Sequence, residues 1–241
     1  MSSVIGSIIE RRRIVIQGIV QGVGFRPFVY GQALQWKLVG FVLNDSSGVT
    51  IEVEGTTESL DGFQNTLRDK TPPLARIDTL YTEQIAPCYD STFNIAQSQA
   101  GSERTALISP DTATCDDCLH ELFNQEDRRF YYPFINCTNC GPRFTIIQDV
   151  PYDRDKTTMG EFQMCIACKA EYEDPSNRRF HAQPNACPVC GPTVRMLNGV
   201  EGAINRAPTS TNDDLIIAAA RQIATGAIFA IKGLGGISPG L

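Results

Sequence analysis

The chain has 241 residues, of which 42% are hydrophobic and 20% charged, and its 21 basic and 27 acidic side chains give a net charge of −6. At about 100–200 residues per domain, this length has room for two compact domains and part of a third. The composition argues against a disordered chain and against a basic coat for nucleic acid, and no apolar run reaches the roughly 18 residues of a membrane span.

The first hundred residues predict an α+β domain with no metal-like grouping of side chains. Residues 12–20, 39–44, 49–54, 77–85 and 93–96 have the spacing of strands. Residues 25–37 and a segment that begins at Thr57 and ends before Pro72 have the spacing of helices. The order strand, helix, strand, strand, helix, strand is the ferredoxin-like arrangement, an antiparallel sheet with two helices on one face.

A glycine-rich stretch joins the first strand to the first helix. Its residues are Gln21, Gly22, Val23, Gly24, Phe25 and Arg26. Glycines let backbone N–H groups converge, the following helix adds its positive end, and Arg26 can supply a bidentate guanidinium, so an anion such as phosphate is the natural guest. A dinucleotide fingerprint does not fit, because Pro27 stands where that motif requires a third glycine. On spacing alone, a plain strand–helix turn is as good an interpretation as a phosphate-binding loop.

Eight of the nine cysteines form four C-x-x-C pairs, separated by 18, 24 and 18 residues. The pairs are Cys115/Cys118, Cys137/Cys140, Cys165/Cys168 and Cys187/Cys190. The second half repeats the first with a period of 50, and Glu121/Glu171 and the Arg-Arg-Phe triplets at 128–130 and 178–180 obey the same shift. We interpret residues 110–197 as a tandem module whose repeats are 115–140 and 165–190.

Two C-x-x-C turns bring four thiolates together and complete a tetrahedral zinc site. Four disulfides would need an oxidising compartment, yet the arginines at 11–13 follow a short apolar stretch, the reverse of a secretory signal. Redox pairs are the other alternative. We expect two structural zinc ions and a cytoplasmic protein. The spacing favours one ion per repeat, although cross-bracing stays open.

Two histidines and one further cysteine are left over. His181 could be a fifth ligand or a donor to a ligand, but a polar residue packed near the cysteines is the simpler interpretation. Cys88 stands alone and is expected to be half-buried.

The cysteine-rich module is acidic. From Cys115 to Cys190 it holds 12 Asp or Glu and 8 Lys or Arg, a balance of −4. Each Zn²⁺ held by four thiolates adds −2, so the loaded module carries about −8. Phosphate backbones need the opposite sign, which favours a structural or protein-docking role over a nucleic-acid finger.

The end of the chain predicts a connector and the start of another unit. Residues 198–212 are rich in Gly, Pro, Thr and Ser and are typical of a linker. Helical spacing follows at 213–226 and an apolar strand at 228–231.

The first domain resembles the acylphosphatases. The resemblance lies in VQGVGFRPFVY and GFVLNDSSGVTIEVEG, covers about residues 10–98, and includes the Asn-x-x-x-Gly turn. It implies that Arg26 binds phosphate and that Asn44 orients the attacking water. Acyl phosphates have a good leaving group, so positioning water and neutralising charge suffice without a histidine nucleophile or a metal.

From about residue 10 to 236, the chain is similar to the HypF family of carbamoyltransferases in nickel–iron hydrogenase maturation. The motifs that carry this likeness are CGPRFTII, PYDRDKTTM, RRFHAQPNACPVCGP and AIKGLGG. The resemblance implies carbamoyl phosphate, or another acyl phosphate, as substrate and HypE as protein partner, and it makes residues 213–241 a truncated start of a YrdC-like domain. We therefore expect an acylphosphatase that cannot complete carbamoyl transfer by itself. The alternative is a catalytically silent, zinc-stabilised interaction module.

Overall fold

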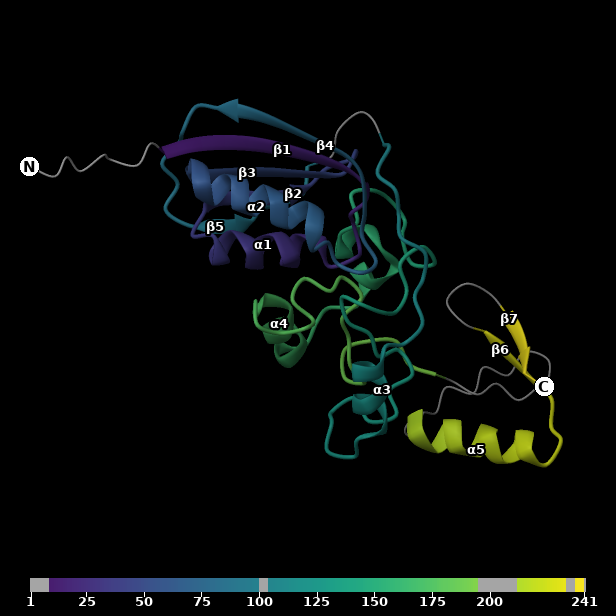
Figure 1. Cartoon of the computed structure of the whole chain (residues 1–241). Coiled ribbons are helices and arrows are strands. Elements are labelled where there is room, and N and C mark those ends of the chain that lie inside the picture. The colour runs from purple at the N-terminus through teal and green to yellow at the C-terminus, as the bar shows by residue number, and fades with distance from the viewer. Residues whose placement is uncertain (1–8, 100–103, 195–211, 233–236, 241) are drawn as a thin grey trace, which may run out of the picture.

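The computed structural model describes residues 9–99, 104–194, 212–232 and 237–240. Along the chain these form a sheet domain, a cysteine-rich module and a C-terminal helix with a strand pair (Figure 1). Most of the predicted linker at 198–212 and the Gly-Leu-Gly-Gly segment at 233–236 lie outside the described residues.

The sheet domain has the α+β fold that the sequence predicts. Its strands are β1 (Ile9–Ile19), β2 (Val39–Asn44), β3 (Val49–Thr56), β4 (Arg76–Ile85) and β5 (Phe93–Ile95), in the order β4-β1-β3-β2-β5. The expectation of an all-antiparallel sheet was wrong, because β5 pairs parallel to β2. β4 runs antiparallel to β1, so it ends where β2 begins, and the chain enters β5 from that same end.

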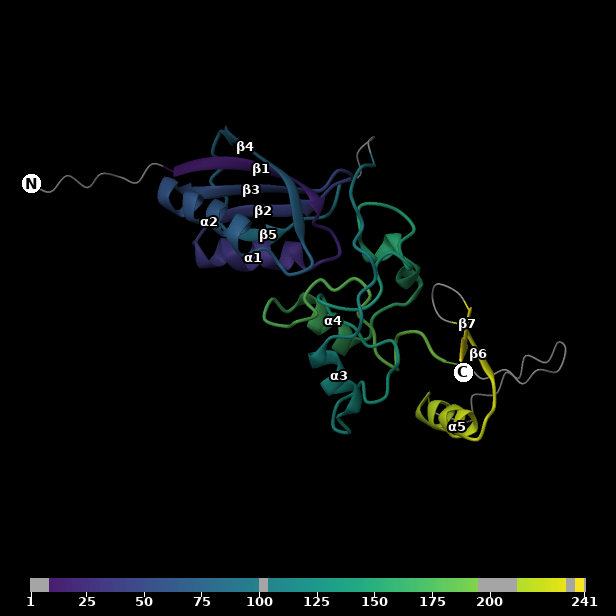
Figure 2. The same ribbon diagram turned by 45° about the vertical axis from the view of Figure 1, so that its right-hand side comes forward.

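Two helices cover one face of this sheet, α1 (Phe25–Gln35) and α2 (Thr57–Asp69), as Figures 1 and 2 show. Alternate residues of β1 and β3, such as Ile14 and Ile51, pack with Leu60 and Phe63 of α2 in one apolar core. Thr56 caps α2 by accepting the N–H of Ser59 at 3.2 Å. The core therefore holds rigidly the strand and helix ends that frame the glycine-rich loop.

The cysteine module repeats its local structure as well as its sequence. Cys115 and Cys165 precede the short helices α3 (Asp116–Phe123) and α4 (Ile166–Glu173), which are related by the shift of 50 residues. Tyr131 and His181 share this shift and a positive φ, 52° and 54°. Between the repeats lie two 3₁₀ turns, η1 (Arg154–Lys156) and η2 (Thr158–Glu161). The module is a structural duplication.

The C-terminal part has the helix and strand expected there. They are α5 (Asn212–Ala224) and β6 (Phe229–Lys232), and β6 pairs with a strand that the sequence did not predict, β7 (Ile237–Gly240). Both views place this part beside the cysteine module and away from the sheet (Figures 1 and 2). Among the described residues, no helix combines the length and apolar character that a bilayer crossing requires.

Candidate active site and metal centres

The glycine-rich loop lies between β1 and the start of α1. Gly22 and Gly24 have φ angles of 72° and 73°, which glycine adopts at low energetic cost. α1 begins directly after Gly24, so the positive end of the helix lies at the loop. Val23 of this loop packs into the core of the sheet domain. The other loop residues line a common cavity: Gln21, Gly22, Gly24, Phe25 and Arg26.

Arg26 is buried and already has two partners. Its guanidinium donates to Ser98 Oγ at 3.1 Å and to Asp153 Oδ1 at 2.7 Å. Asp153 comes from the cysteine module, 127 residues further along the chain. A carboxylate of the module thus holds the cation that sequence analysis assigned to phosphate.

Asn44 ends β2 and lines the same cavity, with 1% of its surface exposed. Its Oδ1 is a buried acceptor without a hydrogen-bond partner. An unpaired buried acceptor is costly, and such atoms are frequent where a site binds a ligand or a water. The structure therefore brings the two predicted site residues, Arg26 and Asn44, to one cavity.

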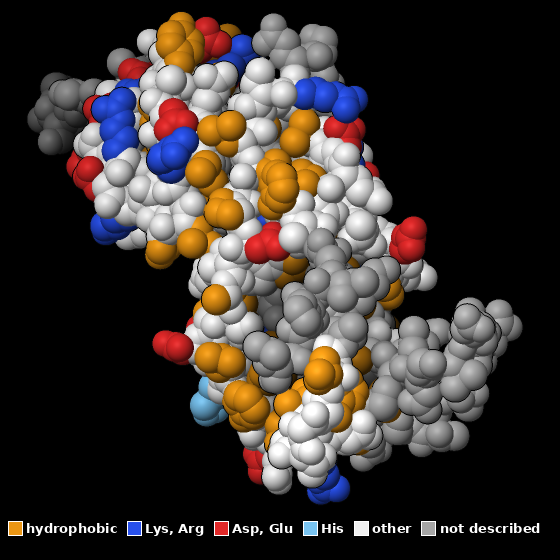
Figure 3. Space-filling model, turned by 90° about the vertical axis from the view of Figure 1, so that its right-hand side faces the viewer, with side chains coloured by type: hydrophobic (Ala, Val, Ile, Leu, Met, Phe, Trp, Pro, Cys, Tyr) orange, Lys and Arg blue, Asp and Glu red, His pale blue; other side chains and the backbone are white. Residues whose placement is uncertain are grey.

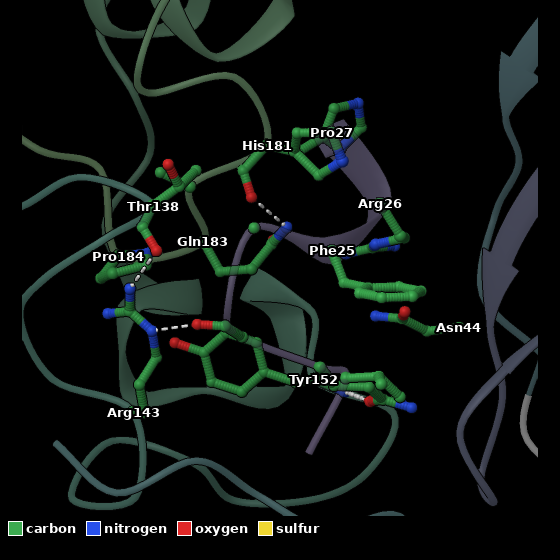
Figure 4. A pocket seen from close by; sticks show the side chains of 15 residues that line it. Phe25, Arg26, Pro27, Asn44, Thr138, Arg143, Tyr152, His181, Gln183 and Pro184 are labelled. Carbon is green, nitrogen blue, oxygen red and sulfur yellow. Dashed lines mark hydrogen bonds between the residues drawn. The ribbon is translucent and has the colours of Figure 1, made fainter. Parts of the chain in front are cut away.

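The cysteine module closes this cavity from the opposite side. In Figure 4, Arg26, Phe25 and Asn44 face side chains of the module across the space. The module residues at the cavity are Thr138, Arg143, Tyr152, His181, Ala182, Gln183 and Pro184. The cavity therefore lies between the glycine-rich loop and the cysteine module.

Two module residues hold the loop directly. The Arg143 guanidinium donates to the carbonyl of Gly22, and the backbone N–H of Tyr152 donates to Gln21 Oε1 at 2.7 Å. Gln21 Nε2 in turn donates to the carbonyls of Asp45 and Gly48, both at 2.7 Å. The loop is therefore fixed between the β2–β3 turn and the cysteine module.

Sequence reasoning missed Arg143, Tyr152 and Asp153. The motifs CGPRFTII and PYDRDKTTM contain these three residues, so the family resemblance marked their segments without giving the residues a role. The 50-residue repeat places Thr193 at the position of Arg143, so this arginine is present in one copy only.

His181 belongs to the cavity and not to a cysteine cluster. Its ring lies against Tyr172 and Phe180, with centroid separations of 4.9 and 4.6 Å. Burial, together with the charge of Arg26, lowers the pKa of His181 to about 4, so the imidazole is neutral at pH 7. Neither four-cysteine cluster of the described chain contains a histidine.

The expectation of a half-buried Cys88 was wrong, because this thiol is exposed. The backbone N–H groups of Cys88 and Tyr89 donate to the buried Glu54 carboxylate, so the backbone faces inward and the side chains project outward.

The other eight cysteines form two clusters, each within one repeat. The first cluster is Cys115, Cys118, Cys137 and Cys140, and the second is Cys165, Cys168, Cys187 and Cys190. The closest sulfur pairs within a cluster lie 3.5 to 3.8 Å apart. Zinc–sulfur bonds of about 2.3 Å give a tetrahedron with edges of about 3.8 Å, whereas a disulfide needs about 2.05 Å. The donor sets fit metal binding and fit zinc.

Each cluster receives an arginine from the opposite repeat. Arg178 donates to Cys118 Sγ with both terminal nitrogens at 3.2 Å, and Arg128 donates to Cys168 Sγ at 3.4 and 3.3 Å. The arginines that follow, Arg179 and Arg129, pair with Glu121 and Glu171 across the same repeat boundary. Burial opposes ionisation of Glu171, but Arg129 and Arg128 outweigh it and lower its pKa to about 2. Each repeat thus compensates the thiolate charge of the other.

Charges are mixed on the visible outer surface. On the face in Figure 3, basic side chains of the described residues lie among acidic ones. Elsewhere in the described residues, ion pairs such as Arg12–Asp61 and Arg104–Asp149 join charges of opposite sign.

Comparison with known proteins agrees with this geometry. Residues 12–95 match the Acylphosphatase family, and residues 114–147 and 164–197 each match the HypF finger. An acylphosphatase of Mannheimia succiniciproducens is 42% identical over 69 residues, which are 28% of this chain and 76% of that protein. Fold and site define an acylphosphatase domain joined to a pair of HypF-type fingers.

The relatives that extend along nearly the whole chain are HypF proteins. Carbamoyltransferase HypF of Rhodobacter capsulatus is 50% identical over 225 residues, which are 93% of this chain and 29% of that protein. A crystal structure of full-length HypF in the phosphate- and nucleotide-bound form has 45% identity and a TM-score of 0.87, covering 96% of this chain and 29% of that one. The chain belongs to the HypF family, and it spans less than a third of the length of these relatives.

Because each cluster receives an arginine from the opposite repeat, we expect that removing one of these arginines weakens metal binding at one cluster only. Arg178→Ala removes the guanidinium from the first cluster, and Arg128→Ala removes it from the second. We expect each variant to alkylate about tenfold faster at the cysteines of the cluster it touches, because an uncompensated thiolate site holds its ion less firmly. Mass spectrometry of iodoacetamide-labelled peptides separates the clusters. Lys169→Ala, on an exposed ion pair with Glu173, is the control. Identical labelling patterns in the two arginine variants would contradict the exchange.

Proposed function

We propose that the acylphosphatase domain hydrolyses small acyl phosphates, with carbamoyl phosphate as the substrate in the cell. The observation that carries this proposal is the meeting of Arg26, Asn44 and the glycine-rich loop at one cavity. The crystal structure of full-length HypF is of a phosphate- and nucleotide-bound form, which is in keeping with a phosphate site in this family.

The proposed chemistry needs charge neutralisation and a placed water. The loop N–H groups and Arg26 hold the phosphate and neutralise its charge as the transition state forms. Asn44 Oδ1 accepts a hydrogen bond from water, whose oxygen attacks phosphorus in line with the acyl oxygen. The bond between phosphorus and the acyl oxygen breaks, and carbamate leaves with the electron pair of that bond. A proton of the attacking water passes to a phosphate oxygen. His181 is neutral and carries no step.

We further propose zinc as the ion of both cysteine clusters, with a structural role. Four thiolates close a tetrahedral site and leave no position for substrate. Such sites need reduced thiols, which is consistent with a cytoplasmic location. In the family as a whole, the carbamate made here would serve carbamoyl transfer to HypE and hydrogenase maturation.

A second candidate function rests on the ion pair of Arg26 with Asp153. If Asp153 stays paired with Arg26 in the presence of an acyl phosphate, the domain does not bind the phosphate and is a catalytically silent, zinc-stabilised interaction module. Phosphate release from acetyl phosphate or carbamoyl phosphate separates the two, because the silent module releases none.

Arg26→Ala and Asn44→Ala test the proposed site. We expect kcat/KM for carbamoyl phosphate to fall about 10²- to 10³-fold in each, because each removes one group that acts on the transition state. Phosphate release measures the rate, and circular dichroism checks the fold. Arg76→Ala, in an exposed ion pair on β4, serves as the control and keeps full activity. Wild-type rates in the Arg26 variant would refute the site.

Asp153→Asn tests whether the carboxylate competes with phosphate for Arg26. Removing a negative charge 2.7 Å from the guanidinium should lower the Ki of inorganic phosphate about threefold to tenfold. Asp155→Asn makes the same charge change on the exposed side of η1 and should leave Ki unchanged. A higher Ki in the Asp153 variant would mean that the carboxylate instead holds Arg26 in its working position.

A further inference from the structure

Arg143 joins the first knuckle (residues 137–140) to the glycine-rich loop. Its side chain is 1% exposed, and every hydrogen bond that its guanidinium makes goes to a backbone carbonyl. One of these carbonyls is that of Gly22. The others belong to Cys137, Thr138, Cys140 and Pro142, at 2.9 to 3.1 Å.

The bond to Gly22 also fixes a donor of the loop. In a trans peptide the C=O and the following N–H point in opposite directions. The only cis peptide of the described chain is Val150–Pro151, so the Gly22–Val23 peptide is trans. With the Gly22 carbonyl directed at Arg143, the N–H of Val23 is directed away from it.

The two glycines also give the module room to approach. A Cβ on Gly22 would lie 3.2 Å from Arg143 Cδ and 3.3 Å from the Tyr152 ring, and a Cβ on Gly24 would lie 3.4 Å from Thr138 Cβ. At Gly22 and Gly24 the loop thus lies close to the cysteine module, and at Gly24 to the first knuckle itself.

The second repeat shows that a cysteine cluster of this type does not need such an arginine. Thr193 stands at the equivalent position. There the carbonyl of Cys187 is satisfied by the N–H groups of Cys190 and Gly191, at 3.1 and 2.9 Å. Cys137 and Cys140 of the first knuckle also form a backbone bridge, but the carbonyls of Cys137, Thr138 and Cys140 accept additional hydrogen bonds from Arg143.

We propose that Arg143 is a positioning residue for phosphate binding: it imposes the shape of the first knuckle on the glycine-rich loop. This inference rests on the proposed function. It makes phosphate affinity depend on the first cysteine cluster, through a side chain whose guanidinium donates only to backbone carbonyls.

Arg143→Lys in the full chain is the test. Lysine keeps the positive charge and some carbonyl bonds, but one ammonium cannot reach both the knuckle and Gly22 as the planar fork does. We expect the Ki of inorganic phosphate and the KM of acetyl phosphate to rise at least tenfold. Both constants are independent of the fraction of folded enzyme, so partial unfolding cannot imitate this result. Arg143→Gln, which keeps one amide donor without the charge, is the second variant and should show the same rise.

Arg11→Lys is the matched control. Arg11 is also buried, at 3% exposed, and donates to the carboxylates of Glu52, Glu54 and Asp90, but it makes no hydrogen bond to the loop or to the described part of the cysteine module. We expect a comparable loss of thermal stability with an unchanged Ki. A Ki within twofold of wild type in both Arg143 variants overturns the inference. Failure of the proposed function is distinct, since wild type itself would then neither bind phosphate nor release it from acetyl phosphate.

Discussion

A loop that offers its backbone N–H groups to a ligand cannot use the same groups to hold its own shape. Its carbonyls and side chains must be held from outside, and here the cysteine module does so at two points. Arg143 holds the Gly22 carbonyl and the Tyr152 N–H holds the Gln21 side chain, whereas the Asp153 carboxylate pairs with Arg26 and is expected to compete with phosphate. The acylphosphatase domain supplies the core and the strand ends, but its loop is completed by residues more than a hundred positions away in the sequence.

The module depends in turn on its own duplication. Each four-cysteine cluster concentrates negative charge, and the nearest compensating guanidinium comes from the other repeat. Neither repeat is therefore electrostatically complete alone. Arg143 donates to carbonyls of the first knuckle, and Arg178 of the second repeat donates to a cysteine sulfur of the same cluster. Direct contacts therefore link the metal site, the arginines that each repeat supplies to the other, and the shape of the loop. An exposed ion pair would contribute little to such coupling, whereas Arg129, Arg143 and Arg179 are nearly fully buried.

Local patterns explain what the sequence could predict. The strands and helices of the sheet domain, the meeting of Arg26 with Asn44 and the grouping of cysteines within repeats follow from periodicity, spacing and family resemblance. The parallel β5 depends on where β4 ends, and the exposure of Cys88 depends on Glu54, so both needed the tertiary structure. Asp153 and Tyr152 reach the loop through long-range contacts that leave no periodic trace. The family motifs contain these residues and Arg143, but a motif alone does not show which of its side chains reaches the loop.

If the cysteine module shapes the phosphate site, removal of its metal must weaken phosphate binding. Isothermal titration of inorganic phosphate into the full chain, before and after the metal is removed with a chelator, measures this effect directly. Fluorescence of Trp36, the only tryptophan, which packs against the core of the sheet domain, reports whether that domain stays folded. We expect at least tenfold weaker phosphate binding with an unchanged Trp36 spectrum. Equal phosphate affinity with and without metal would show that the module does not shape the site.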